Sequence, residues 1–251
     1  MAGEVALIVG GGPGVSASCA RLFAREGMQV AVAARNPDKA VLQALARENG
    51  TKLYGCDASD AQAVSRLFAS VEDDLGQPKL VVHNIDGRER SPDIFRKSTT
   101  DADPGLVLDV IKNSAYSAFL VGQQAVRSML PGGADNHGHR GTIIFTNASA
   151  SFKGYPESAA FAIECRGKTG LAESLAREFI PQGIHVVNVP IDAAIGWTQE
   201  NGTRAHPLAG TAIDDSMADP DRIAETYLQL HRQHRSTWAF EVVLRPWTEK
   251  C

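Results

Sequence analysis

The chain has 251 residues, four cysteines and a formal net charge of −4 at pH 7. This length is enough for one large core, and α/β proteins of this size commonly form a single domain. The slightly acidic balance, with an isoelectric point near 6.0, gives no reason to expect nucleic acid or a membrane surface as a partner.

The cysteines are too few and too widely separated for a disulfide framework or a metal knuckle, so we expect no metal. No apolar run reaches the length that spans a membrane, and the first residues lack the basic-then-apolar order of a signal peptide. We therefore expect a soluble, cytoplasmic protein that acts on a small molecule.

The first 34 residues predict a strand, a tight turn, a helix and a second strand. Residues 5–9 form the continuous apolar run of a strand that is covered on both faces. After the glycines of 10–14, hydrophobic residues recur at helical spacing as far as Gly27, which predicts a left-handed helix end. Residues 28–34 are again apolar, and the whole is a βαβ unit.

The turn between the first strand and helix predicts a dinucleotide-binding loop. Glycine has no Cβ atom, so Gly10, Gly12 and Gly14, with Val15 at the helix start, can bring backbone N–H groups against a diphosphate. The alternative is an ordinary tight turn. The position between a predicted strand and helix favours dinucleotide binding.

Charged side chains follow the next two predicted strands. Arg35 ends the second strand, where the ribose of an adenosine would lie, and it can pair with a 2′-phosphate; this favours NADP over NAD, although a solvated turn residue is the alternative. Asp57 and Ala58 follow the third strand, and Asp57 either borders the adenine or bonds the next turn. Ser59 is predicted to cap the helix that runs to Leu75.

The rest of the chain continues to alternate strands and helices, which predicts a doubly wound parallel sheet of about seven strands. Residues 1–251 would form one domain, with a dinucleotide-binding half over about 1–130 and a substrate half containing a lid over about 192–218. An exposed, aperiodic excursion is expected at 88–105. The further strands are expected at 52–56, 79–84, 141–146, 184–191 and 238–244, and the further helices at 37–49, 60–75, 109–129, 157–180 and 220–234.

The helix expected at 157–180 carries small residues that allow another surface to approach closely. They favour a homo-oligomer, either a dimer or a tetramer. These residues are Ala159, Ala160, Gly167 and Gly170.

From end to end the chain resembles the short-chain dehydrogenase/reductase family, whose members move a hydride between NAD(P) and a carbonyl or alcohol. The resemblance implies a Rossmann fold and cofactor contacts at Asn84, Ile85, Ile191 and Thr198. The matching features are the Gly10-x-x-x-Gly14 turn, Asp57, the segment 83–86, the Pro-Gln-Gly-Ile-His-Val of 181–186 and the tail 245–250.

The family's catalytic residues are replaced at every expected position. Phe161 stands for the tyrosine, Cys165 for the lysine one turn later and Ala148 for the serine. Ser114, beside Asn113, stands for the helix asparagine. A phenylalanine ring has no exchangeable proton, so the usual acid is missing.

Tyr155, in the loop before this helix, and Ser149 are the candidates to replace the missing groups, and the alternative for Tyr155 is a wall of the pocket. Lys168 is interpreted as a solvated helix residue and His83 as a hydrogen-bonded strand residue. Cys165 would need an activating base to act as a nucleophile.

Other positions also depart from the family. The last glycine of the turn is Ser16, and Asp192 follows the sixth strand. A carboxylate at Asp86 would oppose a diphosphate or ribose unless it is paired.

Three functions remain open. The first is an NADP(H)-binding oxidoreductase for a small carbonyl or alcohol that uses a non-standard proton donor. The second is the same scaffold used for elimination, isomerisation or cyclisation. The third is a non-catalytic binding or subunit role, and the fold alone does not choose between them.

Overall fold

The computed structural model describes residues 3–90, 92–199, 201–206, 209–213 and 215–250. Its centre is a parallel sheet in the order β3-β2-β1-β4-β5-β6, which is typical of dinucleotide-binding proteins. The apolar runs read from the sequence form most of these strands, because their residues are covered on both faces. The strands are β1 (Val5–Val9), β2 (Gln29–Ala34), β3 (Lys52–Gly55), β4 (Pro78–His83), β5 (Gly141–Ala148) and β6 (Ile184–Ile191).

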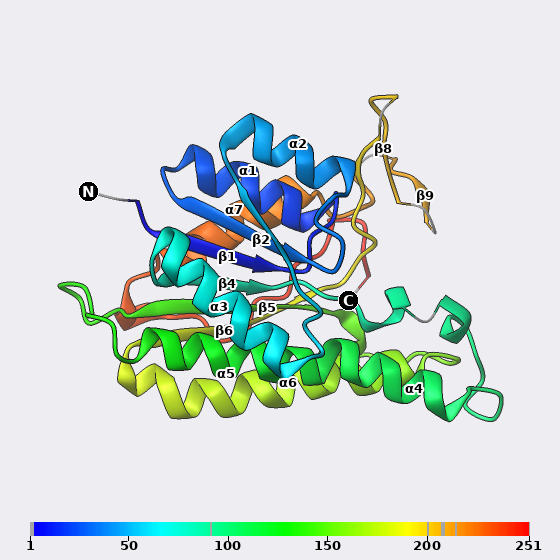
Figure 1. Cartoon of the computed structure of the whole chain (residues 1–251). Helices are drawn as coiled ribbons and strands as arrows, with labels where there is room; N and C mark the ends of the chain where they lie inside the picture. The colour runs from blue at the N-terminus through cyan, green and yellow to red at the C-terminus, as the bar shows by residue number, and fades with distance from the viewer. Residues whose placement is uncertain (1–2, 91, 200, 207–208, 214, 251) are drawn as a thin grey trace.

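Helices cover both faces of the sheet (Figure 1). α1, α2 and α7 pack on one face, and α3, α5 and α6 pack on the other, so the sheet separates two apolar cores. The helices are α1 (Val15–Arg25), α2 (Ala40–Asn49), α3 (Ala61–Leu75), α4 (Pro104–Ile111), α5 (Ser117–Met129), α6 (Ala159–Phe179) and α7 (Pro220–His231).

The last expected strand, residues 238–244, lies along the edge of β6 without forming a continuous ladder. The amide of Val242 donates to the carbonyl oxygen of Asn188 at 3.1 Å, and that of Leu244 donates to Pro190 at 3.0 Å. Only isolated parallel bridges join the two segments. The sheet therefore has six regular strands and an irregular seventh segment, and the expected doubly wound fold is confirmed.

The long helix expected at 109–129 is interrupted by a π-helical turn. α4 is followed directly by η3 (Lys112–Tyr116), a π-helix, and then by α5. The helical run also begins earlier than expected, because the side chain of Asp103 accepts a hydrogen bond from the amide of Leu106. Single π turns widen a helix and are common beside functional sites.

Asp60, and not Ser59, caps α3, so the predicted cap is wrong by one residue. The Asp60 carboxylate accepts hydrogen bonds from the amides of Gln62 and Ala63 at 2.7 and 2.8 Å. The Ser59 hydroxyl instead donates to Asp57 at 2.7 Å. A carboxylate at this position reaches two free amides at the helix start and also favours the positive end of the helix dipole.

Two excursions expected to be irregular carry short elements on the side where the strands end, at the right of Figure 1. The first contains η1 (Gly87–Arg90) and η2 (Pro92–Ile94). The second contains a three-stranded antiparallel sheet of β7 (Trp197–Thr198), β8 (Arg204–His206) and β9 (Gly210–Thr211). Three further single turns are η4 (Ser149–Ser151), η5 (Ile180–Gln182) and η6 (Arg235–Thr237).

Within the ranges given above, no helix combines the length and the apolar character needed to cross a bilayer.

Candidate active site

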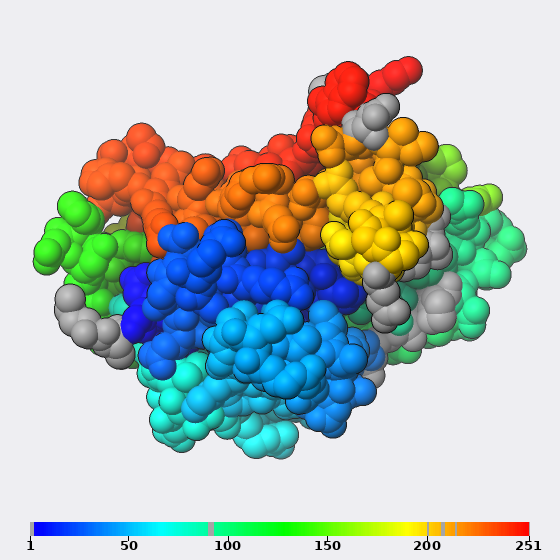
Figure 2. All heavy atoms as spheres, turned by 90° about the horizontal axis from the view of Figure 1, so that it is seen from above, coloured from blue at the N-terminus to red at the C-terminus, as the bar shows by residue number. Residues whose placement is uncertain are grey.

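A large cleft opens at the carboxyl ends of the parallel strands. Its walls come from the glycine turn, the ends of β2, β4, β5 and β6, the start of α6 and the segment that contains β7 and β8. In Figure 2 the gold atoms of that segment lie against the blue atoms of the amino-terminal part. Ligands of open α/β sheets bind at this edge, where the strand order reverses.

A chain of hydrogen bonds holds the glycine turn closed. The Ser16 hydroxyl donates to the carbonyl oxygen of Gly10 at 2.5 Å, and the Asn84 amide group donates to the Ser16 oxygen at 2.7 Å. Gly10 has a φ of 110°, and a Cβ atom there would lie 2.1 Å from the Asn84 carbonyl oxygen. A Cβ atom at Gly12 would meet no described atom within 4 Å. Ser16 thus stabilises the turn, and the backbone at Gly12 borders open space.

Two cations stand at the end of the cleft beside β2 and α2. Arg35 lies exposed just after β2, and Lys39 lies at the start of α2 with its Nζ atom 3.5 Å from the Gly11 carbonyl oxygen; both line the cleft. Burial raises the pKa of the nearby Glu89, while Lys39 and Arg35 oppose that rise. Sequence reasoning identified Arg35 and missed Lys39, because Lys39 reaches the site only through the turn before α2.

Asp57 and Ala58 also line the cleft, as expected for residues after β3. The Asp57 carboxylate accepts hydrogen bonds from the amide and the hydroxyl of Ser59 at 3.0 and 2.7 Å. Asp57 therefore bonds the next turn, as one of its two predicted roles requires, and it also borders the cleft.

The two proposed catalytic side chains are joined by a hydrogen bond on the wall of the cleft. The Tyr155 hydroxyl donates to the Ser149 oxygen at 3.2 Å, and both residues line the cleft. Ala148 and Phe161 line the same wall. Cys165 is fully buried, and burial raises the pKa of its thiol to about 12, so a reactive thiolate is disfavoured.

Lys168 is buried, so its interpretation as a solvated residue is wrong. It is only 3% exposed, and its Nζ atom donates to the carbonyl oxygens of Ile85 and Thr146, each at 3.2 Å. Lys168 follows Phe161 by seven residues, which is two helical turns, so both side chains lie on one face of α6. This seven-residue spacing is the feature of the sequence that could have predicted a buried Lys168.

Glu164 lies on the same face of α6, four residues before Lys168, and sequence reasoning missed it. It is fully buried, and its Oε2 atom accepts a hydrogen bond from the amide of Gly87 at 3.0 Å. The Ser114 hydroxyl lies beside this carboxylate and lowers its pKa slightly. Burial raises the pKa of Glu164 to about 7, although Lys168 opposes that rise.

Asp86 is neutralised within the protein. The Nε and Nη2 atoms of Arg88 donate to its two carboxylate oxygens at 3.0 and 2.7 Å. Burial alone would raise the pKa of Asp86, but hydrogen bonds from Arg88 outweigh burial and lower it. Because Asp86 is paired with Arg88, its carboxylate no longer opposes a diphosphate or ribose nearby.

Asp192, the other unexpected carboxylate, is also paired. It is 2% exposed, and its Oδ2 atom lies 2.7 Å from the Lys153 ammonium and 3.7 Å from the Arg245 guanidinium. Ile191 precedes it and lines the cleft. Thr198 lies on β7 opposite Arg204 of β8 and does not line the cleft. Its neighbour on β7, Trp197, does line it.

The π turn η3 decides which helix residue faces the cleft. Asn113 lines it, whereas Ser114, predicted to stand for the family's asparagine, is fully buried beside Glu164. His83 is buried and its Nε2 atom lies 2.9 Å from the Ser117 hydroxyl, which fits the predicted hydrogen-bonded strand residue. Across the described positions no three His, Cys, Asp or Glu side chains gather as a metal site.

The strand order, the glycine turn and the position of the cleft define a Rossmann-type α/β protein. The sequence model of a protein family described as enoyl-(acyl carrier protein) reductase matches residues 11–238. The chain therefore belongs to the short-chain dehydrogenase/reductase family.

Relatives with known activities are distant. The chain is 30% identical over 204 residues to 3-oxoacyl-[acyl-carrier-protein] reductase MabA of Mycobacterium avium, which covers 79% of this chain and 69% of that protein. It is 27% identical over 184 residues to a 3beta-hydroxysteroid dehydrogenase of Mediterraneibacter gnavus, which covers 72% of this chain and only 62% of that protein.

Solved structures share the whole fold. A short-chain dehydrogenase from Rhodopseudomonas palustris superposes with a TM-score of 0.77 at 26% identity, over 97% of this chain and 99% of that one. An alcohol dehydrogenase from Thermococcus sibiricus, solved with 5-hydroxy-NADP, gives 0.79 at 18% identity, over 99% and 98%. The second likeness is one of fold alone.

Proposed function

We propose that this protein is an NADP(H)-dependent oxidoreductase that acts on a small carbonyl or alcohol and uses a proton donor other than the family's tyrosine. The observation that carries the proposal is one continuous cleft. It runs from Arg35 and Lys39, past the glycine turn, to the bonded pair Tyr155 and Ser149.

The glycine turn fits a diphosphate. Gly10 is already required by the contact with Asn84, but the open space at Gly12 serves nothing in the described packing and suits a ligand that approaches the backbone closely. Gly14 and Val15 then begin α1, whose amino-terminal N–H groups favour an anion. Asn84 and Ile85 at the end of β4, and Ile191 at the end of β6, would contact the rest of the dinucleotide.

Two cations at the adenosine end favour NADP over NAD. Arg35 and Lys39 can both pair with a 2′-phosphate, and among the described residues neither forms a salt bridge, although both lie near Glu89. The structural relative from Thermococcus sibiricus, which was solved with an NADP derivative, has the same fold. NAD would lack the group that these side chains can bind.

A bound nicotinamide would supply or accept the hydride. For the proton, we assign Tyr155 as the donor to the carbonyl oxygen and Ser149 as the group that orients its hydroxyl, since the two are joined at 3.2 Å. Lys168 holds the ends of β4 and β5 together beneath this site through Ile85 and Thr146. Thr198 would reach a carboxamide only if β7 moved toward the cleft.

The test is a titration of the purified protein with NADPH and NADH, followed by absorbance of the reduced cofactor with a panel of aldehydes and ketones. We expect NADPH to quench tryptophan fluorescence, since Trp197 lines the cleft, and to bind more tightly than NADH. Binding of neither nucleotide at saturating supply would refute the proposal.

Non-redox chemistry is the second candidate, and two residues favour it. Phe161 offers no exchangeable proton, and Glu164 is a buried carboxyl whose pKa lies near neutrality, as suits a general acid or base in elimination, isomerisation or cyclisation. This function predicts product without any change in cofactor absorbance. A non-catalytic role predicts neither product nor cofactor consumption, and a protein that co-purifies.

We also propose that the chain forms a homo-oligomer through η3, α5 and α6. Tyr116 and Phe119 are 44% and 43% exposed and stack with ring centroids 6.4 Å apart, and Ile163 is 48% exposed. The expected small-residue face contributes less, because Gly167 already packs on Ala115 of the same chain. Sedimentation of the wild type and of Phe119→Asp tests this: the variant should be smaller.

A further inference from the structure

Phe161 stands at the position of the family's tyrosine, and a guanidinium group covers its ring. The Cζ atom of Arg88 lies 3.3 Å from the centroid of the Phe161 ring and 4.6 Å from that of the Phe95 ring. Arg88 therefore sits between two aromatic faces, both of which attract a cation. The stack fixes a positive charge at the end of the cleft where a substrate would lie.

Asp86 clamps the same guanidinium from one edge. It accepts hydrogen bonds from Nε and Nη2 of Arg88, while Nη1 makes no hydrogen bond with any described residue. Arg88 is thus held rigidly with one edge open, which is the arrangement that suits bidentate binding of a carboxylate or phosphate.

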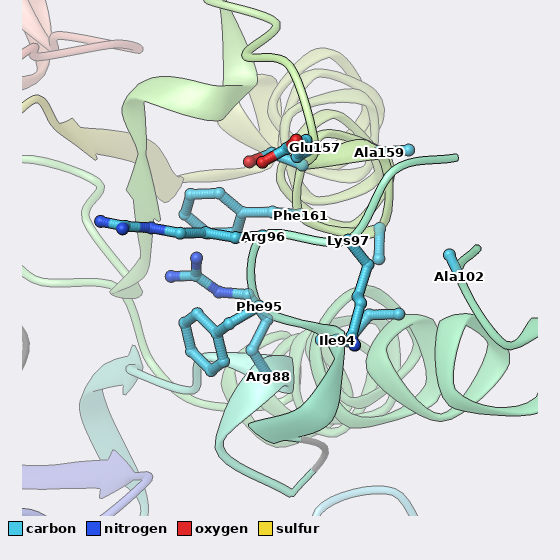
Figure 3. Close-up of a pocket in the computed structure, with 11 residues that line it drawn as sticks. Arg88, Ile94, Phe95, Arg96, Lys97, Ala102, Glu157, Ala159 and Phe161 are labelled. Carbon is cyan, nitrogen blue, oxygen red and sulfur yellow. The ribbon is translucent and has the colours of Figure 1, made fainter. Parts of the chain in front are cut away.

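A second guanidinium points to the same place. Figure 3 shows the Arg96 side chain extending past the ring of Phe161 and the Arg88 guanidinium beside that ring, whereas the Lys97 side chain runs toward Ile94. Within the described ranges Arg96 makes neither a hydrogen bond nor an ion pair. Its charge is available to a ligand.

Backbone strain is concentrated around this pocket. Among described residues other than glycine, Arg96, Glu157 and Asp215 have positive φ, at 53°, 56° and 57°, and the first two line the pocket of Figure 3. Such conformations persist where the surroundings impose them, and they cluster at ligand sites. The strain and the two cations are independent observations at one place.

We propose that Arg88 and Arg96 form an anion-binding subsite at the substrate end of the cleft, and that the substrate carries a carboxylate or phosphate group. The assignment of the anion to a substrate rests on the proposed oxidoreductase function; binding of the anion itself does not. Asp86 balances the charge of Arg88, so the uncompensated positive charge of this subsite comes from Arg96.

The test is a ligand-detected NMR titration with benzoate, its uncharged isostere benzamide, and phenyl phosphate. We expect benzoate to bind roughly tenfold more tightly than benzamide, because charge-assisted bonds to guanidinium are lost in the amide. Tighter binding of phenyl phosphate than of benzoate identifies a phosphate substrate, and the reverse order identifies a carboxylate. Equal affinity of benzoate and benzamide would overturn the proposal.

Variants localise the effect. Arg96→Gln should weaken benzoate binding roughly tenfold, Arg96→Lys should weaken it less, and Lys97→Gln should leave it unchanged because that ammonium points away. If Lys97→Gln weakened benzoate binding as much as Arg96→Gln, the effect would come from the overall positive charge of the region, and the subsite would be refuted. Circular dichroism checks the fold of each variant.

NADPH titrations on the same samples separate the two proposals. NADPH binding without discrimination of benzoate would leave the oxidoreductase standing and refute the subsite. Discrimination of benzoate without NADPH binding would do the opposite.

Discussion

The amide of Gly87 donates a hydrogen bond to the carboxylate of Glu164 over 3.0 Å, and this bond ties η1 to α6 beneath the cleft. The approach is close on two sides. A Cβ atom at position 87 would lie 2.3 Å from Glu164 Oε2 and 2.3 Å from the carbonyl oxygen of Val110. The segment that carries Asp86 and Arg88 is therefore placed by packing that only glycine permits.

Gly87→Ala should destabilise the fold by about 2 to 3 kcal/mol, because the added methyl group overpacks a site where one neighbour is backbone. The measurement is denaturant-induced unfolding, followed by circular dichroism. Gly154→Ala is the matched control, since a Cβ atom there would meet nothing within 4 Å. Equal unfolding midpoints for the two variants would contradict the close packing at Gly87.

Glu164 should make the stability of the protein depend on pH. Burial raises its pKa in the folded chain from the ordinary 4.5 to about 7, so the folded state binds this proton more strongly than the unfolded state. The free energy of unfolding should consequently fall as the pH rises from about 4.5 to about 7, by on the order of 3 kcal/mol, and then level off.

Glu164→Gln removes the titrating group, so this part of the pH dependence should vanish. Unfolding curves at pH 5 and pH 7.5 measure it. Glu173→Gln serves as the control, because Glu173 lies on the same helix with a side chain that is 46% exposed. If wild type and Glu164→Gln lose the same stability between the two pH values, the buried carboxyl is not the cause.

Much of the fold could be predicted because local signals and burial agree. The apolar run 5–9 became β1, and Gly27, predicted to end the first helix, has a φ of 86°. β6 was predicted with its observed bounds, Ile184–Ile191. In each case the pattern of apolar residues already indicates which faces of the strand or helix are buried. Tertiary packing then favours the same structure as the local sequence.

The site was harder to predict, because it depends on which helix face meets which loop. Lys168 resembles an exposed helix lysine in sequence, yet the carbonyl oxygens of Ile85 and Thr146 surround its ammonium. The π turn η3 brings Asn113 rather than Ser114 to the cleft, and a regular helical spacing does not predict such a turn. Contacts between distant segments decide both.

Arg35 and Lys39 should set the preference for NADPH. Replacing both with alanine should weaken NADPH binding by roughly ten- to a hundredfold, because charge-assisted bonds to the 2′-phosphate are lost, and should leave NADH binding nearly unchanged. Fluorescence titration measures both affinities. Arg47→Ala, which changes an exposed cation on α2 that does not line the described cleft, should affect neither. Parallel losses for NADPH and NADH would argue against a 2′-phosphate site here.

Tyr155→Phe should lower the turnover number for carbonyl reduction by about 10²- to 10⁴-fold, as expected when a general acid is removed. The NADPH dissociation constant should stay the same, since the change deletes one oxygen at the substrate side of the cleft. Ser149→Ala should lower turnover less, and the double variant should be no slower than Tyr155→Phe alone, because the two hydroxyls are joined at 3.2 Å and act as one unit.

Tyr116→Phe is the control for this series, since Tyr116 lies on the outer side of η3 and is 44% exposed. If the Tyr155→Phe variant kept full turnover, Tyr155 would not be the proton donor, and another group would have to fill that role. Glu164 would then be the next residue to replace, and loss of turnover in Glu164→Gln with an altered pH profile would assign the proton to the buried carboxyl, whose pKa of about 7 suits it to that exchange.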